Sequence, residues 1–312
     1  MLKAILITGA TGMIGKALTD TLLNKGHIVH HLTRKSTIST NPNLKKFTWD
    51  VFAGTIDEKC IEGVGAVIHL AGENIAEKPW TKKRRLELTE SRTKSIHLIY
   101  ELLKKSSNHG VKTVVSASGI GFYGDRGNTL LTETSAAGAG FLSAISVQWE
   151  KAVDAGSQLN LRIVKLRSGI VLDIKEGALP ELSKPVKAGF PAALGKGTQW
   201  MPWIHLIDTV NLYLYALENE TMNGAYNMAA PGIVTNEQFM QILAEAYHKK
   251  CWLPHVPSIA LRLLLGKMSE MLLMSTRTSS DKILQSGFEF QFPELKAALR
   301  ELVLTKEAPV NN

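Results

Sequence analysis

The sequence predicts an α/β fold, in which helices cover both faces of a doubly wound parallel sheet and a smaller, mostly helical C-terminal domain follows. Short β-branched runs alternate with amphipathic stretches through the first half of the chain. This βαβα order is typical of a parallel sheet. A second observation supports it, because a glycine-rich segment directly follows the first apolar run, where such folds turn from strand to helix.

The expected elements follow from hydrophobic periodicity. Leu18, Leu22 and Leu23 recur at helical spacing after the first strand, and the segment 98–103 does so before the fourth strand. Thr235 is a candidate N-cap for a helix that extends to His248. The expected strands are Ala4–Thr8, Ile28–Thr33, Ala66–Leu70, Thr113–Ser116 and Leu161–Leu166.

The change of rhythm after Leu172 predicts two domains. Residues 1–172 form the sheet domain, to which 203–230 return, and 173–202 together with 231–312 form the smaller domain on the substrate side. The segment 177–202 is rich in glycine and proline, and a helix is expected from Thr209 to Leu217.

Composition is that of an ordinary globular protein, with 312 residues, 45% hydrophobic content and 21% charge. Cys60 and Cys251 are too few for a disulfide framework or a metal cluster, and a reducing compartment fits them. The formal charge of +8 includes two tight basic runs, 82–85 and 249–250, which we expect to coat a solvated face. No nucleic-acid motif accompanies them.

Targeting and membrane signals are weak. The apolar run that begins at Met1 ends at Thr8, too early for a signal sequence, and we interpret it as a buried strand. The longest apolar stretches fall far short of the ~20 residues of a membrane span. The expected location is the cytoplasm.

The glycine-rich segment predicts a Rossmann-type dinucleotide site. Gly9 allows a tight turn, Gly12 lets the backbone approach a pyrophosphate, and Gly15 permits close packing of the helix. The first turn of that helix offers unpaired N–H groups to phosphate oxygens. The alternative is a glycine-rich turn without a ligand.

The end of the second strand indicates which dinucleotide is bound. Thr33 and Arg34 stand where NAD-preferring proteins usually place an acidic residue for the ribose hydroxyls, whereas an arginine can bind a 2′-phosphate. We therefore expect NADP(H). The alternative is that Arg34 is a solvated residue at a strand end.

The GxxGxxG spacing resembles the extended short-chain dehydrogenase/reductases, and further motifs narrow the resemblance. The sequence is similar to the atypical subgroup called epimerase family proteins, or nucleoside-diphosphate-sugar epimerase-like proteins, over nearly its whole length. That subgroup carries a short C-terminal helical domain, here from about Trp252. The motifs are His69–Ile75, Trp80, Lys83, Ser91–Arg92, Arg167–Leu172, Pro202–His205 and Gly287–Phe290.

The resemblance implies a set of cofactor contacts. Thr11, Gly12, Met13 and Ile14 cradle the pyrophosphate, and Thr33 and Arg34 hold the adenosine ribose phosphate. Leu70, Ala71 and Gly72 lie beside the ribose linkage, Asp50 faces the adenine, and Glu87 and Arg92 reach the cofactor from the following helix. The alternative for Asp50, Glu87 and Arg92 is a surface ion pair.

The sequence departs from the resemblance at the catalytic residues. Enzymes of the extended type use a serine and a Tyr-x-x-x-Lys helix for acid/base chemistry. Ser118 matches the serine, but the tyrosine and lysine positions fall on Leu142 and Ser146. Tyr123 is the candidate replacement, with an aromatic lid as the alternative.

Three other candidates are assigned structural roles or excluded. Tyr100 and Lys104 have the Tyr-x-x-x-Lys spacing but stand on the helix before Ser116, so we expect a packed aromatic ring and an exposed lysine. His205 is expected to be a hydrogen-bonded structural residue. No metal-ligand spacing is visible, and no metal is expected.

Two functions remain open. The first is an NADP-dependent oxidoreductase or epimerase that acts on a small substrate, nucleotide-linked or not, between the sheet edge and the C-terminal domain. Ser118 would polarise the substrate oxygen, and Tyr123 or water would donate the proton. The second is a non-catalytic NADP(H) sensor that regulates a protein partner, which the absent tyrosine and lysine favour. Nucleic-acid binding lacks a motif.

Overall fold

The structure, a computed structural model, describes residues 4–35, 39–106 and 108–307. Met1 to Lys3, at the start of the expected first strand, lie outside these residues. The chain packs as two compact units. The first comprises the described residues of Met1–Gly119, Ala144–Arg167 and Val210–Tyr226, and the second those of Ile120–Ser143, Ser168–Thr209 and Asn227–Asn312. Residues 120–143 belong to the second unit in this division, whereas the sequence analysis placed them in the sheet domain. The domain boundaries expected from the sequence stay a prediction.

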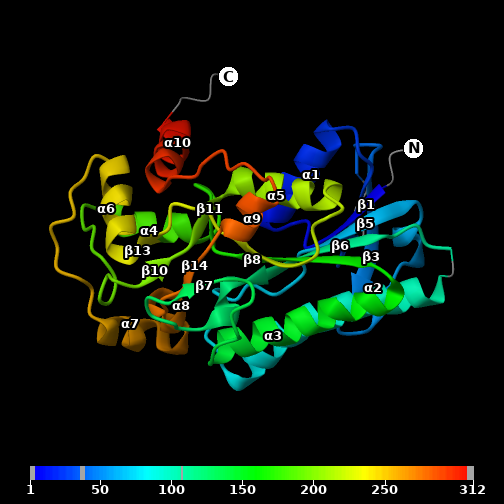
Figure 1. Cartoon of the computed structure of the whole chain (residues 1–312), viewed down its shortest axis with the longest axis horizontal. Coiled ribbons are helices and arrows are strands. Elements are labelled where there is room, and N and C mark those ends of the chain that lie inside the picture. The colour runs from blue at the N-terminus through cyan, green and yellow to red at the C-terminus, as the bar shows by residue number, and fades with distance from the viewer. Residues whose placement is uncertain (1–3, 36–38, 107, 308–312) are drawn as a thin grey trace. The chain divides into compact units, whose positions relative to one another are not determined.

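The first unit is built on an eight-stranded sheet of described residues, in the order β12-β8-β6-β5-β1-β2-β3-β4. Neighbouring strands from β6 to β3 run parallel, and β4 pairs antiparallel at the edge. Figure 1 shows α1 and α5 on one face of the sheet and α2 and α3 on the other. This is the predicted doubly wound α/β arrangement of Rossmann type.

The bounds of these elements agree closely with the sequence pattern. Ala4–Thr8 forms a strand as predicted, and Thr113–Gly119 extends three residues beyond the predicted end. The strands are β1 (Ala4–Thr8), β2 (Val29–Thr33), β3 (Leu44–Asp50), β4 (Thr55–Ile56), β5 (Val64–His69), β6 (Thr113–Gly119), β8 (Arg162–Ser168) and β12 (Gly224–Met228). The helices are α1 (Met13–Asn24), α2 (Lys82–Lys105), α3 (Phe141–Asp154) and α5 (Leu206–Glu218).

The second unit contains the helices of the C-terminal region and three short strand pairs. Its apolar core includes Trp203, Phe239 and Leu299, all fully buried. Its strands are β7 (Leu130–Leu131), β9 (Ile170–Leu172), β10 (Trp200–Met201), β11 (Trp203–His205), β13 (Val234–Thr235) and β14 (Arg277–Thr278). Its helices are α4 (Ala178–Lys187), α6 (Asn236–Ala246), α7 (Ser258–Leu265), α8 (Glu270–Leu273), α9 (Asp281–Gln285) and α10 (Leu295–Glu307).

The predicted N-cap of α6 is confirmed. The Thr235 hydroxyl accepts a hydrogen bond from the Gln238 N–H, and the Gln238 side chain accepts one from the Thr235 N–H. This reciprocal pair is a capping box, which satisfies two N–H groups that the first turn of a helix leaves unpaired.

Candidate functional site

The glycine loop joins β1 to α1 by a turn that side chains would obstruct. Gly9 has φ +66°, and a Cβ atom there would lie 2.8 Å from the carbonyl group of Leu70. A Cβ at Gly15 would clash with the Gly9 oxygen and lie 2.6 Å from Ala10 Cα. Gly9 therefore serves both the turn and the close approach to the segment after β5, while Gly15 packs on the loop itself.

Gly12 differs from its two neighbours. Its φ is −79°, and a Cβ there would meet only the Gly9 oxygen, at 3.5 Å. The fold itself would accept a side chain at this position. Gly12 is the N-cap of α1, it offers no side-chain hydrogen bond, and no acidic residue stands in the first turn. The positive end of the α1 dipole is therefore not neutralised by a nearby carboxylate, which suits a phosphate group.

Thr8 holds the segment after β5 against the loop, a role that the sequence analysis missed. Its fully buried hydroxyl accepts hydrogen bonds from the N–H groups of Leu70 and Ala71, at 3.1 and 3.0 Å. The predicted contacts Leu70 and Ala71 thus lie beside Gly9, whereas Gly72 lies against the Arg92 side chain. The position of Thr8, directly before the first glycine, was the available signal.

Arg34 stands at the carboxyl end of β2 with its side chain 87% exposed. It borders a hollow of about 450 Å³ whose lining also includes Asp50, at the end of β3. Asp50 Oδ1 accepts hydrogen bonds from the N–H groups of Phe52 and Ala53, both at 2.9 Å. Arg34 and Asp50, two of the three residues predicted for the adenosine end of the cofactor, are therefore brought to one hollow, where Asp50 also shapes the turn.

Arg84 corrects one expectation for the basic run 82–85. Lys82 and Lys83 are exposed as predicted, but Arg84 is buried at the start of α2. Its guanidinium lies 3.2 Å from Glu73, 3.4 Å from Glu87 and 3.6 Å from Glu77. An arginine surrounded by carboxylates can be buried because its charge is paired, and the sequence run alone did not reveal these partners.

Arg92 lies beneath the backbone that follows β5. It donates to the carbonyl oxygens of Leu88 and Glu73, at 2.8 and 3.0 Å, and its guanidinium stacks 5.1 Å from the Trp149 ring centre. Burial, with the charge of Arg84, lowers the Arg92 pKa to about 10. Arg92 fixes the Gly72–Glu73 segment, and its predicted contact with the cofactor stays a prediction, as does that of Glu87.

Ser118 belongs to a buried polar network of three elements. Its hydroxyl donates to Glu150 Oε1 at 2.7 Å, and Arg167 donates to both carboxylate oxygens, at 2.7 and 2.8 Å. Burial raises the Glu150 pKa, but hydrogen bonds and charge from Arg167, with Ser118 and Lys165, outweigh it, and the pKa falls below its usual value. In this arrangement the Ser118 hydrogen is donated to Glu150 and not toward a substrate oxygen.

Tyr123 and the residues at the Tyr-x-x-x-Lys positions are packed within the protein. The Tyr123 hydroxyl is fully buried and donates to Asn227 Oδ1 at 2.6 Å. At the tyrosine position, Leu142 packs closely on Gly121. A Cβ atom added to Gly121 would lie 3.1 Å from the Leu142 Cβ. Ser146, at the lysine position, is buried. Neither position supplies the usual acid/base group.

The structural roles expected for Tyr100, Lys104 and His205 are confirmed. Tyr100 is buried and donates to the Val153 oxygen at 2.7 Å, while Lys104 is exposed. His205 Nδ1 accepts from the Ile207 N–H, so its Nε2 donates to Glu301, 3.1 Å away. The described residues contain no group of three or more His, Cys, Asp or Glu side chains arranged for a metal ion.

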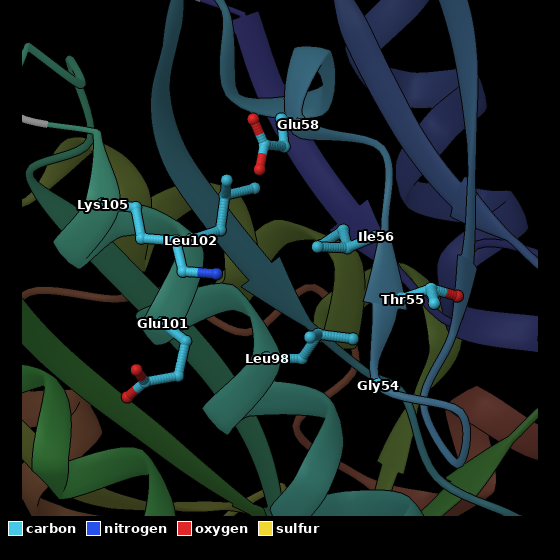
Figure 2. A pocket seen from close by; sticks show the side chains of 8 residues that line it. All are labelled: Gly54, Thr55, Ile56, Glu58, Leu98, Glu101, Leu102 and Lys105. Carbon is cyan, nitrogen blue, oxygen red and sulfur yellow. The ribbon is translucent and has the colours of Figure 1, made fainter.

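A second hollow, of about 230 Å³, shares Thr55 and Ile56 of β4 with the first. Figure 2 shows Leu98 and Leu102 of α2 facing it across from Ile56 of β4, with the charged side chains of Glu58 and Lys105 around them. None of its lining residues belongs to the predicted site. The residues predicted to contact the cofactor lie instead on the loop after β1, at the ends of β2, β3 and β5, and on α2.

Comparisons with known proteins agree with this geometry. A model of the NAD dependent epimerase/dehydratase family matches residues 5–143, and a model of a domain of unknown function, DUF1731, matches 256–302. An epimerase family protein of Staphylococcus aureus strain MRSA252 is 35% identical over 306 residues, which cover 97% of this chain and 99% of that protein.

Two solved structures are also similar. The crystal structure of the human epimerase family protein SDR39U1 with NADPH has a TM-score of 0.85 and 30% identity, and the match covers 96% of this chain and 99% of that one. The nucleoside-diphosphate sugar epimerase of Corynebacterium glutamicum has a TM-score of 0.79 and 29% identity, over 97% of this chain and 59% of that one.

The fold and its glycine loop define an NAD(P)-binding protein of the short-chain dehydrogenase/reductase type. The resemblance inferred from the sequence motifs is confirmed, since a relative above 30% identity covers nearly the whole chain. The chain belongs to the NAD-dependent epimerase/dehydratase family, among the epimerase family proteins with a C-terminal DUF1731 domain. No helix within the described ranges is both long and apolar enough to cross a membrane.

Proposed function

We propose that the chain binds NADP(H) through the glycine loop and Arg34 and acts as an oxidoreductase or epimerase on a small, nucleotide-linked substrate. The cofactor assignment rests on the glycine loop. Position 12 is a glycine although the fold would accept a side chain there. That space suits the approach of a pyrophosphate. Arg34 suits the 2′-phosphate, and the human relative was solved with NADPH.

The proposed contacts keep the predicted set. Thr11, Gly12, Met13 and Ile14 receive the pyrophosphate at the α1 N-terminus, and Thr33 and Arg34 receive the adenosine ribose phosphate. When bound, the nicotinamide supplies or accepts a hydride. The nucleotide-linked class of substrate is proposed from the Corynebacterium glutamicum relative, which is named a nucleoside-diphosphate sugar epimerase.

Ser118 is the proposed catalytic serine, with a role that differs from the expected one. Because it donates its hydrogen to Glu150, Ser118 would accept a hydrogen bond from a substrate hydroxyl and so orient an alcohol. The Tyr123 hydrogen is donated to Asn227, which favours a positioning role for Tyr123 and leaves proton transfer to water.

A second function, an NADP(H) sensor that regulates a protein partner, is favoured by one observation. The usual acid/base positions hold Leu142 and Ser146. The Tyr123 hydroxyl, the candidate replacement, is hydrogen-bonded to Asn227. Occupancy of the loop by cofactor would then be the signal, and no turnover would be required.

The two functions are separated by a turnover assay with NADP⁺ or NADPH and a panel of nucleoside-diphosphate sugars, following reduced nicotinamide and sugar configuration. An enzyme should convert a member of the panel, lose that activity on Ser118→Ala and keep its NADPH affinity. If no sugar is converted and a binding partner responds to NADPH in wild type but not in Gly12→Val, the sensor is supported instead.

A further inference from the structure

Glu73 brings a carboxylate to the end of β2, where the sequence analysis found none. It follows β5 in the chain, yet its Oε1 lies 3.8 Å from Arg34 Nη1. Its side chain is about one-third exposed, whereas Arg34 is almost fully exposed. The end of β2 therefore carries an arginine from its own strand and an acidic side chain from the segment after β5, a strand that β1 separates from β2 in the sheet.

Glu73 is held in place from several directions. Its N–H donates to Ser91 Oγ at 3.0 Å, its carbonyl oxygen accepts from Arg92 at 3.0 Å, and its Oε2 lies 3.2 Å from Arg84. All three partners stand on α2. The contact with Arg34 is the longest of the set, so Arg34 can move away while Glu73 stays where α2 fixes it.

The two side chains prefer different cofactors. An arginine at this strand end binds the 2′-phosphate of NADP(H), and a carboxylate accepts hydrogen bonds from the ribose hydroxyls of NAD(H). A carboxylate within a few Å of Arg34 also repels a bound phosphate dianion, because like charges at this separation disfavour one another. Glu73 therefore opposes the preference that Arg34 creates.

We propose that Glu73 is a specificity-determining residue, which lowers the preference for NADPH over NADH by accepting hydrogen bonds from the ribose hydroxyls and repelling the 2′-phosphate. This inference rests on the proposed function, in which Arg34 binds that phosphate. It assigns to this chain a site that accepts both cofactors, with a ratio set by the Arg34–Glu73 pair.

The test is a fluorescence titration of the full chain with NADPH and with NADH, in wild type, Glu73→Gln and Arg34→Ala. Glu73→Gln should tighten the binding of NADPH and weaken the binding of NADH. The dissociation constant for NADH divided by that for NADPH should then rise at least tenfold, about 1.4 kcal/mol. Glu77→Gln is the matched control, because Glu77 also contacts Arg84, at 3.6 Å, and should leave the ratio unchanged. Glu73→Asp keeps the negative charge but moves it away from Arg34, because aspartate has a shorter side chain. It should raise the same ratio by less than Glu73→Gln does.

The outcomes separate the inference from the proposed function. If Arg34→Ala abolishes the NADPH preference while Glu73→Gln and Glu73→Asp leave the ratio at its wild-type value, the role of Glu73 is refuted and the cofactor assignment stands. If Arg34→Ala leaves the ratio unchanged, or wild type binds neither cofactor, both ideas are overturned. Should Glu73→Gln fail to fold, judged by circular dichroism, a Glu73→Asp ratio equal to that of wild type contradicts the inference.

Discussion

Ser118 of β6 donates its hydroxyl hydrogen to Glu150 of α3 across 2.7 Å, and both side chains are buried. Arg167 of β8 holds the same carboxylate with two hydrogen bonds, so one glutamate joins two strands to a helix. Ser118 is thereby given a fixed orientation, and the stability of the sheet unit depends on the charge balance around Glu150.

Arg167→Met should destabilise the protein strongly. Arg167→Met leaves the buried Glu150 carboxylate with only the Lys165 charge, 3.6 Å away, and breaking a buried pair costs about 3–5 kcal/mol. Urea unfolding measures the loss. The control is Lys104→Met, which breaks an exposed pair with Glu101 at 2.7 Å and should cost less than about 1 kcal/mol. Equal losses in the two variants would show that the Glu150 network does not stabilise the fold.

Gly12→Ala and Gly15→Ala should separate binding from folding. A methyl group at Gly15 meets backbone atoms of Gly9 and Ala10, and such overpacking costs about 1–3 kcal/mol. At Gly12 it makes an ordinary contact but occupies the approach of the pyrophosphate. Gly12→Ala should therefore melt near wild type and bind NADPH at least tenfold more weakly, about 1.4 kcal/mol. Wild-type affinity in Gly12→Ala would place the phosphates elsewhere.

Tyr123→Phe should weaken the second unit without changing NADPH affinity. The variant leaves Asn227 Oδ1, in a fully buried side chain, without the Tyr123 donor, and an unsatisfied buried acceptor costs about 1–3 kcal/mol. Thermal unfolding and the NADPH titration measure the two effects. A variant with unchanged stability but no turnover would instead return Tyr123 to the role of proton donor.

The buried histidines make stability fall as the pH falls. Burial, with the charge of Lys46, lowers the His31 pKa from 6.5 to about 4, and burial with Arg92 lowers that of His69 to about 3. Below pH 6.5 these histidines bind protons in the unfolded chain but stay neutral in the folded chain. Each histidine therefore removes up to about 1.4 kcal/mol per pH unit until its folded pKa is reached.

The variant His31→Gln isolates one of these contributions. Thr19 donates its hydroxyl hydrogen to the Gly15 oxygen, so His31 Nε2 donates to Thr19 at 2.8 Å, and a glutamine amide can replace that donor. Urea unfolding between pH 6.5 and pH 4 should show a slope reduced by about one proton. An unchanged slope would mean that His31 titrates alike in both states.

The fold was largely predictable because its signals are local. The apolar run Ala4–Thr8 followed by three spaced glycines identifies β1, its turn and α1, and Thr235 identifies the start of α6. Strand β3 was missed because Lys45 and Lys46 interrupt its apolar residues, and it lies near the sheet edge, where only Trp49 is buried.

The polar contacts of the site were less predictable because they depend on register between distant elements. Glu150 lies 32 residues from Ser118 and 17 from Arg167, and nothing local shows that α3 directs it toward β6. Glu73 was visible within the motif that follows β5, but its approach to Arg34 depends on how the ends of β2 and β5, on either side of β1, are placed and on α2.

The most direct test of the account is the ratio of the NADH and NADPH dissociation constants in wild type and in Arg34→Ala. We predict that wild type binds NADPH at least tenfold more tightly, about 1.4 kcal/mol, and that Arg34→Ala loses this preference. Equal binding of both cofactors by wild type, or an NADPH preference that survives in Arg34→Ala, would contradict the assignment of NADP(H) to this site.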